Sequence, residues 1–138
     1  MPPATPSPVS DIASYHVHVY FDGPEQRAQA LTLREQVAAR FNVSLGTVHD
    51  GQVGPHAKPM YQISFAVELF DRLVPWLMLN RHGLSVLVHP NTGRERDDHL
   101  VHALWLGERL PIVNTQMLSE STQAEGPREP NTRPTLSP

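Results

Sequence analysis

Histidine is the residue type most able to carry chemistry in this chain, because eight histidines stand among 138 residues. Two of them form a His-Val-His pattern at His16 and His18. Alternate residues of a strand point to the same face, so this pattern could present two imidazole nitrogens to one ion. Imidazole suits iron, zinc, copper and nickel. A metal centre is the sharper interpretation, and a solvated or dimer-packed strand face is the alternative.

The elements that must position these histidines follow from hydrophobic periodicity. Alternating apolar residues predict strands at 14–21, 43–49, 60–68 and 84–89, and residues 100–106 are a candidate for a further short strand. Apolar spacings of three and four predict one helix of about 16 residues from Pro24 and another over 70–81. This order predicts an α+β, ferredoxin-like βαββαβ fold, an antiparallel sheet with two helices on one face plus a short extra C-terminal strand. A generic α+β sandwich with another strand order is the alternative.

Strand parity places several histidines on the sheet face that the helices leave uncovered. His16 and His18 share that face with Tyr20, and so does His89 on the fourth strand. The first and fourth strands are adjacent and antiparallel in this fold, so His89 should lie close to His16. His56 lies in the loop 50–59, which we expect to open at the same edge because we expect the third strand to run parallel to the first. The segment after the fourth strand also begins there; it contains Asp97, Asp98, His99 and His102. We interpret its two aspartates as a solvated acidic turn, and a carboxylate ligand or base is the alternative.

Composition excludes several function classes. The net charge of −3 offers no basic footprint for nucleic acid and no lysine or arginine cluster for anionic lipid. No apolar run approaches the length of a membrane span, and the N-terminus lacks the regions of a signal peptide, so we expect a cytoplasmic protein without a membrane partner. Cysteine is absent, which excludes disulfides and thiolate metal sites.

The two ends of the chain differ from its middle. Residues 1–11 and 119–138 are rich in proline, serine, threonine and charge, and neither stretch has a periodic apolar face. We predict a flexible N-terminal tail over 1–11, one folded domain over 12–118 and a flexible Pro-rich C-terminal tail over 119–138.

Four sequence stretches carry a resemblance to a known family: YHVHVYFD (15–22), VGPHAKPMYQISF (53–65), VPWLMLNRHGLSVLVHPNTG (74–93) and DDHLVHALWLGERL (97–110). With them the chain resembles the DOPA 4,5-dioxygenase family, small extradiol-type enzymes that open the ring of 3,4-dihydroxyphenylalanine or related catechols. The resemblance reaches from Tyr15 to about Leu110 and implies a ferredoxin-like fold. Ala57 stands where such sequences often have proline.

The resemblance implies a ring-opening reaction between a catechol and O2, with Fe(II) as the cofactor and zinc as a substitute. The expected metal ligands come from His16, His18, His56 and His89, with most weight on His18 and His89. His99 or His102 would serve as the acid/base or as a partner behind the ligands. Tyr20 could contact the ring, and Arg81 and Arg94 could pair with a substrate carboxylate.

Two other function classes stay open. A zinc-dependent hydrolase could use the same histidines, and a ferredoxin-like module without catalysis could bind a small ligand on the same face. We also predict a homodimer, because an uncovered sheet face would expose Met60, Leu87 and Trp105 to water. The alternative is a monomer whose fifth strand and loops fold across the sheet.

Overall fold

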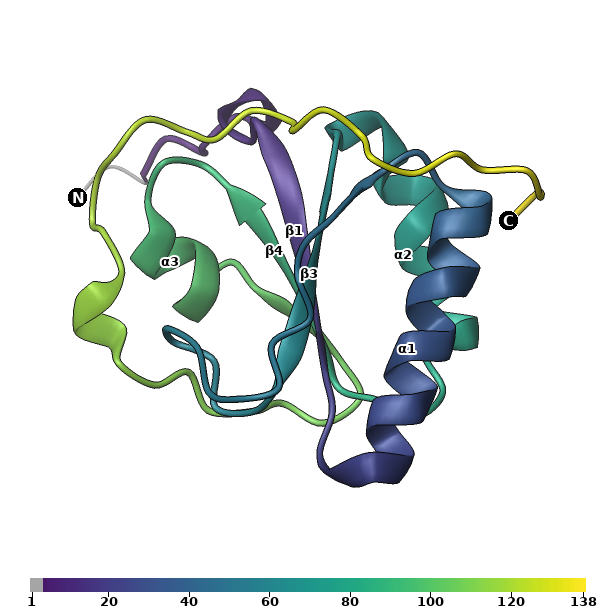
Figure 1. Ribbon diagram of the computed structural model, residues 1–138. Helices are drawn as coiled ribbons and strands as arrows, with labels where there is room; N and C mark the ends of the chain where they lie inside the picture. Colours follow the sequence, from purple (N-terminus) through teal and green to yellow (C-terminus); the bar gives the residue numbers. More distant parts are fainter. Residues whose placement is uncertain (1–3) are drawn as a thin grey trace.

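A five-stranded antiparallel sheet runs through the middle of the molecule, as the computed structural model of residues 4–138 shows (Figure 1). The strands lie in the order β2-β3-β1-β4-β5. Their bounds are β1 Ser14–Tyr20, β2 Ser44–Leu45, β3 Met60–Phe65, β4 Val86–Asn91 and β5 Leu104–Leu106. The first four follow the ferredoxin-like order, and β5 extends the sheet beside β4. The predicted fold class is confirmed.

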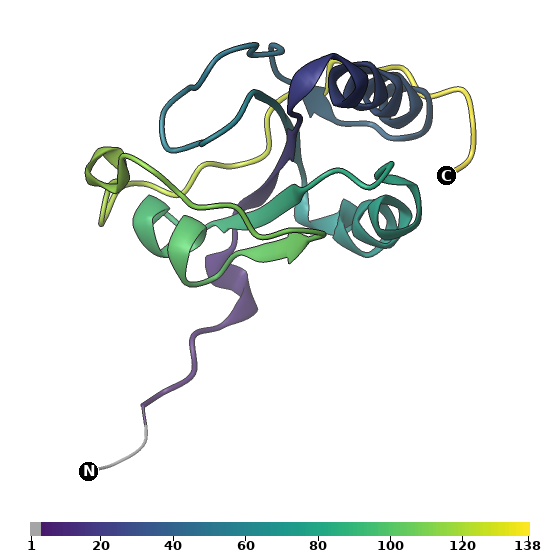
Figure 2. The same ribbon diagram turned by 90° about the horizontal axis from the view of Figure 1, so that it is seen from below.

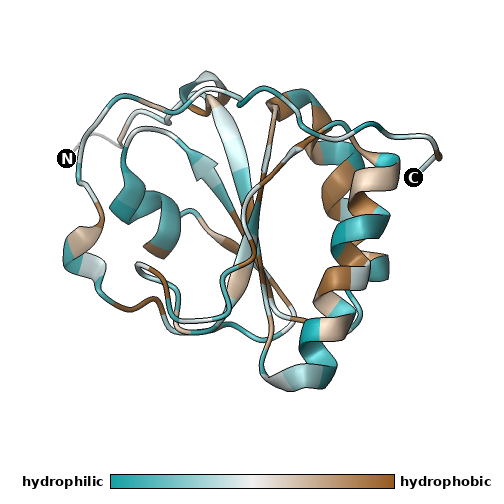
Figure 3. Ribbon diagram, in the orientation of Figure 1, coloured by the Kyte–Doolittle hydropathy of each residue, from teal (hydrophilic) through white to brown (hydrophobic). Residues whose placement is uncertain are grey.

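Two long helices, α1 (Gly23–Arg40) and α2 (Phe70–Asn80), cover one face of the sheet. Their apolar sides turn toward the strands (Figure 3). The core between them includes Val17, Leu33, Ile63 and Leu77, all of them fully buried. This burial supplies the main driving force that holds the helices to the sheet. Neither these helices nor any other in the described part of the chain has the length and apolar character needed to cross a membrane.

Some elements depart from the predicted boundaries. The strand predicted over 43–49 is reduced to β2, and His49 keeps only an isolated bridge to Met60. A short helix, α3 (Glu95–Leu100), precedes β5 in a region where we predicted none. Single 3-10 turns at Val9–Asp11 (η1), Val67–Leu69 (η2) and Thr115–Met117 (η3) complete the elements.

The direction of β3 differs from our expectation. It runs antiparallel to β1, with Tyr20 opposite Met60, so the loop 50–59 leaves the sheet at the far end from His16. The loop nevertheless reaches the same site because it folds back across the sheet. His56 forms backbone bridges with Val53 and with Ile112 there. The expected parallel pairing was wrong, since neighbouring strands of this fold alternate in direction.

The second face of the sheet is covered by the chain itself. The loop 50–59, α3 and the segment after β5 lie on this side in both views (Figures 1 and 2). Met60 and Leu87 are buried there in a small cluster with Tyr20 and Leu110, and Trp105 packs against it. The open apolar face on which we based the homodimer is therefore absent from the described residues.

The last twenty residues form what we name the C-terminal strap, residues 119–138, which runs along the body (Figure 1). We expected a flexible tail, but its main chain and side chains bond to the body at several points. Asn131 pairs with both backbone groups of Leu45, and Thr132 bonds to Val43 and Phe41. These contacts satisfy backbone groups in and beside the edge strand β2. The content of apolar residues, on which we based the flexible tail, carries no information about such polar contacts.

The N-terminal segment behaves differently. Residues 4–11 are exposed, and the stretch before η1 points away from the body (Figure 2). The chain joins the sheet at Ala13, whose N–H donates to the carbonyl of Asn91.

Candidate metal centre

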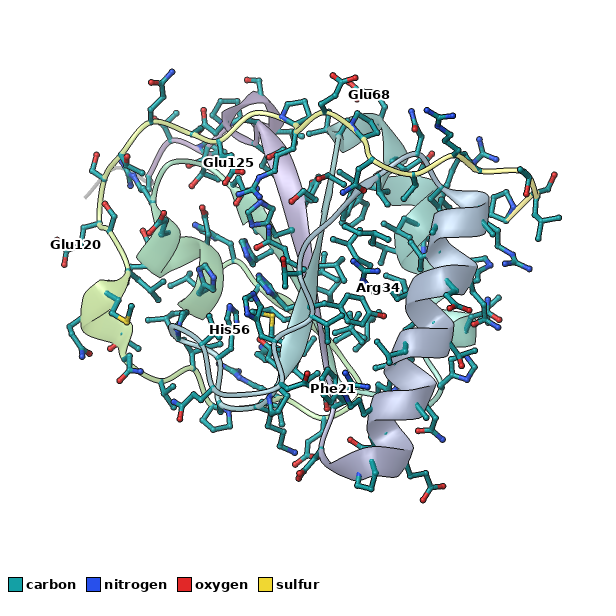
Figure 4. All side chains as sticks on the ribbon, in the orientation of Figure 1. Phe21, Arg34, His56, Glu68, Glu120 and Glu125 are labelled. Carbon is teal, nitrogen blue, oxygen red and sulfur yellow. The ribbon has the colours of Figure 1, made fainter. Side chains whose placement is uncertain are left out.

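Five histidines from four segments meet on the sheet face opposite α1 and α2. We name them the histidine cluster: His16 and His18 on β1, His56 in the loop 50–59, His89 on β4 and His99 on α3. His16 and His89 are direct partners in the β1–β4 register. Figure 4 shows the labelled His56 on the same side of the sheet as α3. The structure thus brings together all four predicted ligands and one of the two predicted acid/base residues.

The ring nitrogens are close enough to share an ion. His18 Nε2 lies 3.2 Å from His89 Nε2. Ligand nitrogens lie within 4.8 Å of one another in two sets of three, His16–His18–His89 and His18–His56–His99. His18 belongs to both sets, so the two sets describe overlapping positions within one site.

Two histidines have their tautomers fixed by backbone carbonyls. His89 Nδ1 lies 2.9 Å from the carbonyl oxygen of Pro90, and His99 Nδ1 lies 2.7 Å from that of Glu95. A carbonyl oxygen only accepts, so each Nδ1 carries the hydrogen and each Nε2 keeps a free lone pair. Metal-binding histidines commonly donate their second N–H to a carbonyl or carboxylate in this way.

Tyr20 holds the position of His56. Its hydroxyl lies 2.7 Å from His56 Nδ1, and its ring stacks on Trp105. Burial raises the pKa of Tyr20 well above its usual value, so the hydroxyl stays protonated. Any metal bond from His56 would therefore use Nε2.

Burial keeps the histidine cluster neutral. Desolvation lowers the pKa of His16 and of His56 to about 4. At His16 the Glu125 carboxylate opposes this shift, whereas Arg128 and His99 add to it, and at His56 repulsion from neighbouring imidazoles adds to it. Desolvation and repulsion from neighbouring imidazoles hold the pKa of His18 and of His89 well below the usual value, and burial also lowers that of His99. A metal ion needs imidazole in this neutral form.

The donor set fits a metal ion. His18 Nδ1 and His16 Nε2 are buried and have no hydrogen-bond partner among the described residues. Neighbouring neutral imidazoles in the histidine cluster also bring ring nitrogens within 4.8 Å of one another, and a cation bound at their lone pairs would offset part of the cost of burying them. The set contains only nitrogen donors, which suits iron or zinc better than calcium or magnesium.

Three predicted site residues lie outside the histidine cluster. Arg81, at the end of α2, donates from Nη1 to the carbonyl of Leu84. Arg94 and His102 line a separate cavity of about 630 Å³. That cavity also contacts Tyr15 and Phe70, so it opens on the helix-facing side of the sheet.

Two acidic residues beside the site have contacts that the sequence did not predict. Asp98 is buried, and its carboxylate accepts hydrogen bonds from the N–H and the hydroxyl of Thr92, which fastens the start of α3 and so helps place His99. The expected solvated turn was wrong for Asp98, although an acidic residue soon after a Thr-Gly turn was a usable signal. Glu125, on the C-terminal strap, has its Oε2 3.5 Å from His16 Nε2. No pattern in the sequence pointed to it.

Known proteins resemble this chain over most of its length. The model of the Dopa 4,5-dioxygenase family matches residues 15–116. A DOPA 4,5-dioxygenase of Amanita muscaria is 34% identical over 111 residues, covering 75% of this chain and 49% of that protein. An uncharacterized 21.2 kDa protein of Botryotinia fuckeliana is 34% identical over 110 residues, covering 72% of this chain and 60% of that protein. The chain thus spans about half to three-fifths of the length of these curated relatives.

A solved structure shares the fold as well as the sequence. A crystal structure from Nostoc punctiforme, described as a candidate dioxygenase, has a TM-score of 0.78 and 49% identity. The match covers 80% of this chain and 95% of that one. Taken with the family match over the whole sheet and the histidine cluster, these likenesses show that the chain belongs to the Dopa 4,5-dioxygenase family.

Proposed function

We propose that this protein is an extradiol-type dioxygenase that opens the ring of a catechol such as 3,4-dihydroxyphenylalanine, with Fe(II) held by the histidine cluster. One observation carries the proposal: four buried histidines and the half-buried His99, all held neutral, converge on one site in a chain of this family. The cytoplasmic location and the homodimer remain predictions of the sequence.

His18 and His89 are the ligands on which the proposal depends most. His16 completes a set of three with them, and His56, which shares a second set with His18, is the further candidate ligand. When bound, Fe(II) would supply the electron density that lets triplet dioxygen react with a closed-shell catechol. The protein contributes a buried, neutral imidazole set that leaves other positions open for substrate, as a facial arrangement of three ligands does. The covering loop 50–59 and α3 limit the access of bulk water to it.

His99 is the acid/base of the proposal, in preference to the distant His102. The carbonyl of Glu95 holds the Nδ1 hydrogen of His99, so Nε2 is the nitrogen that accepts the proton of a catechol hydroxyl. Its ring centroid lies 4.1 Å from that of His89, close to the proposed ligands. Tyr20 holds His56 through its hydroxyl, and a contact between its ring and the substrate stays part of the proposal.

The test is anaerobic reconstitution with Fe(II), followed by a panel of catechols with and without a side-chain carboxylate. We expect one Fe(II) per chain, one O2 consumed per catechol and a yellow ring-opened product. Stoichiometric iron without oxygen uptake on any catechol would remove the dioxygenase proposal.

A zinc-dependent hydrolase is the second candidate, because a set of nitrogen donors suits zinc as well as iron. The same preparation loaded with zinc separates the two candidates. Ester or amide hydrolysis that requires zinc, in the absence of oxygen uptake with iron, would favour the hydrolase. A chain that binds neither metal would favour a module without catalysis.

A further inference from the structure

The C-terminal strap enters the site from outside the part of the chain that matches the family model. That match ends at residue 116, whereas the strap covers residues 119–138. In Figure 4 the labelled Glu125 lies on the same side of the sheet as His56. A role for the strap is therefore a property of this chain that the family match does not supply.

Hydrogen bonds at Glu125 and upstream of it fix the path of the strap. Ser14 Oγ donates to the Glu125 carbonyl at 2.6 Å and accepts from Asn91 Nδ2 at 2.9 Å. Ser14 and Asn91 are partners in the β1–β4 register, and both are buried. Upstream, the Thr122 N–H donates to the carbonyl of Gly93 at 2.6 Å. Gly93 has φ of +90°, and a Cβ there would overlap the Thr122 carbonyl oxygen, so the strap passes where only glycine leaves room.

These anchors bring the Glu125 carboxylate to the edge of the histidine cluster. Arg128 Nε binds Oε1 at 2.6 Å, which leaves Oε2 directed to His16 Nε2 at 3.5 Å. The distance is that of an ion-pair contact rather than a short hydrogen bond. His16 Nε2 is fully shielded from water and has no other partner among the described residues. A rotation in the Glu125 side chain would close this gap.

We propose that Glu125 is a positioning residue of the metal centre: its carboxylate accepts the Nε2 hydrogen of His16 and leaves Nδ1 as the nitrogen able to bind metal. The inference rests on the proposed metal site. It gives His16 the carboxylate partner that metal-binding histidines commonly have, as the carbonyls do for His89 and His99. Glu125 does not belong to either set of three that could share an ion, so it acts through His16.

The first test reads the tautomer of His16 in the metal-free protein at neutral pH, by long-range ¹H–¹⁵N correlation spectra with the signal assigned through His16→Gln. We expect the Nε2–H tautomer in the wild type and a redistribution toward Nδ1–H in Glu125→Ala. Glu125→Gln should retain the wild-type tautomer, because its amide oxygen can still accept. Glu129→Ala, on the same strap and exposed, is the matched control and should change nothing.

The second test is titration with Co(II), followed by its visible absorption. Glu125→Ala should weaken binding by about 10- to 100-fold, the usual effect of removing a partner behind a ligand, whereas Glu129→Ala should bind as the wild type does. An Nδ1–H tautomer in the wild type, or unchanged tautomer and affinity in Glu125→Ala, would overturn the inference. Neither readout requires ring opening, so an inactive iron enzyme with the expected tautomer would remove only the proposed function.

Discussion

His18 is the residue on which the site depends most, because both sets of three histidines include it. We predict that His18→Gln weakens Co(II) or Zn(II) binding by more than about 100-fold, beyond the effect of losing an outer partner. His18 lies among polar rings rather than in the apolar core, so the far-ultraviolet circular dichroism should persist. Equilibrium titration gives the affinity.

The matched control is His82→Gln. His82 is exposed and bonds to Gln36 on α1, outside the histidine cluster. It should keep wild-type affinity. Equal affinities for the His18 and His82 variants would remove His18 from the ligand set.

Burial of neutral histidines also makes stability depend on pH. In the metal-free protein the pKa of His16 and of His56 is about 4, against a usual value of 6.5 when unfolded. Below pH 6.5 these histidines bind protons in the unfolded chain but stay neutral in the folded chain. The free energy of unfolding therefore falls as the pH is lowered to about 4. The two shifts correspond to roughly 3 kcal/mol each.

Urea unfolding in the presence of EDTA, repeated between pH 7.5 and 4, measures this loss. A double variant, His16→Gln with His56→Gln, should show a flatter profile than the wild type. A wild-type midpoint that stays constant down to pH 4.5 would contradict the assigned burial of these rings.

Sequence reasoning reached the site residues that lie on regular strands. Strand parity placed His16, His18 and His89 on one face, because side chains alternate with period two. It could not place Arg94 or His102, since their position depends on how the chain turns after β4. It also missed Glu125, whose contact with His16 spans 109 residues and leaves no local pattern.

At the scale of elements, the C-terminal strap stabilises the edge of the sheet at β2. Asn131 Oδ1 accepts from the Leu45 N–H at 2.8 Å, and Asn131 Nδ2 donates to the Leu45 carbonyl at 2.9 Å. We predict that Asn131→Ala lowers the free energy of unfolding by about 1 kcal/mol, because two hydrogen bonds are lost at an exposed position.

Chemical denaturation compares this variant with Glu129→Ala. Glu129 is exposed on the same strap and makes no hydrogen bond to β2 among the described residues, so its loss should leave the free energy of unfolding within about 0.5 kcal/mol of the wild type. Identical midpoints for the wild type and Asn131→Ala would show that the strap does not hold this edge in solution.

The regular elements were predictable because each has a periodic apolar face that the core requires. The helices α1 and α2 and the strands β1, β3 and β4 all satisfy this condition. The direction of β3 was misjudged because periodicity carries no information on strand polarity. The contacts of the strap could not be predicted from periodicity, because polar side chains rather than apolar burial make them.

At the scale of the whole molecule, a metal bound by the proposed ligands would tie separate segments together: β1 and β4 through His16, His18 and His89, and also the loop 50–59 where His56 is a ligand. Zn(II) at about 100 times its dissociation constant should therefore stabilise the fold by roughly 2.7 kcal/mol. For a chain of this size that corresponds to roughly 5–10 °C in the melting temperature.

Differential scanning calorimetry of EDTA-treated protein, with and without added Zn(II), measures the shift. His18→Gln should show little or none of it. A melting temperature that does not respond to zinc in the wild type would argue against a preformed metal centre.

The homodimer prediction, unlike the predicted fold, has lost the observation on which it was based. Its original reason was an open sheet face, which the loop 50–59, α3 and the segment after β5 now cover. Light scattering at micromolar concentration tests it directly, by separating the monomer mass of 15.4 kDa from twice that value.

The central place of β1 in the sheet has a consequence for synthesis on the ribosome. This strand is translated first, but its neighbours β3 and β4 and the carbonyl of Glu125 follow only after about 40, 70 and 110 further residues. Such high contact order delays the assembly of the sheet. The imidazoles of β1 therefore stay apart from those of the other segments until these partners have emerged, so the proposed metal centre forms only late in synthesis.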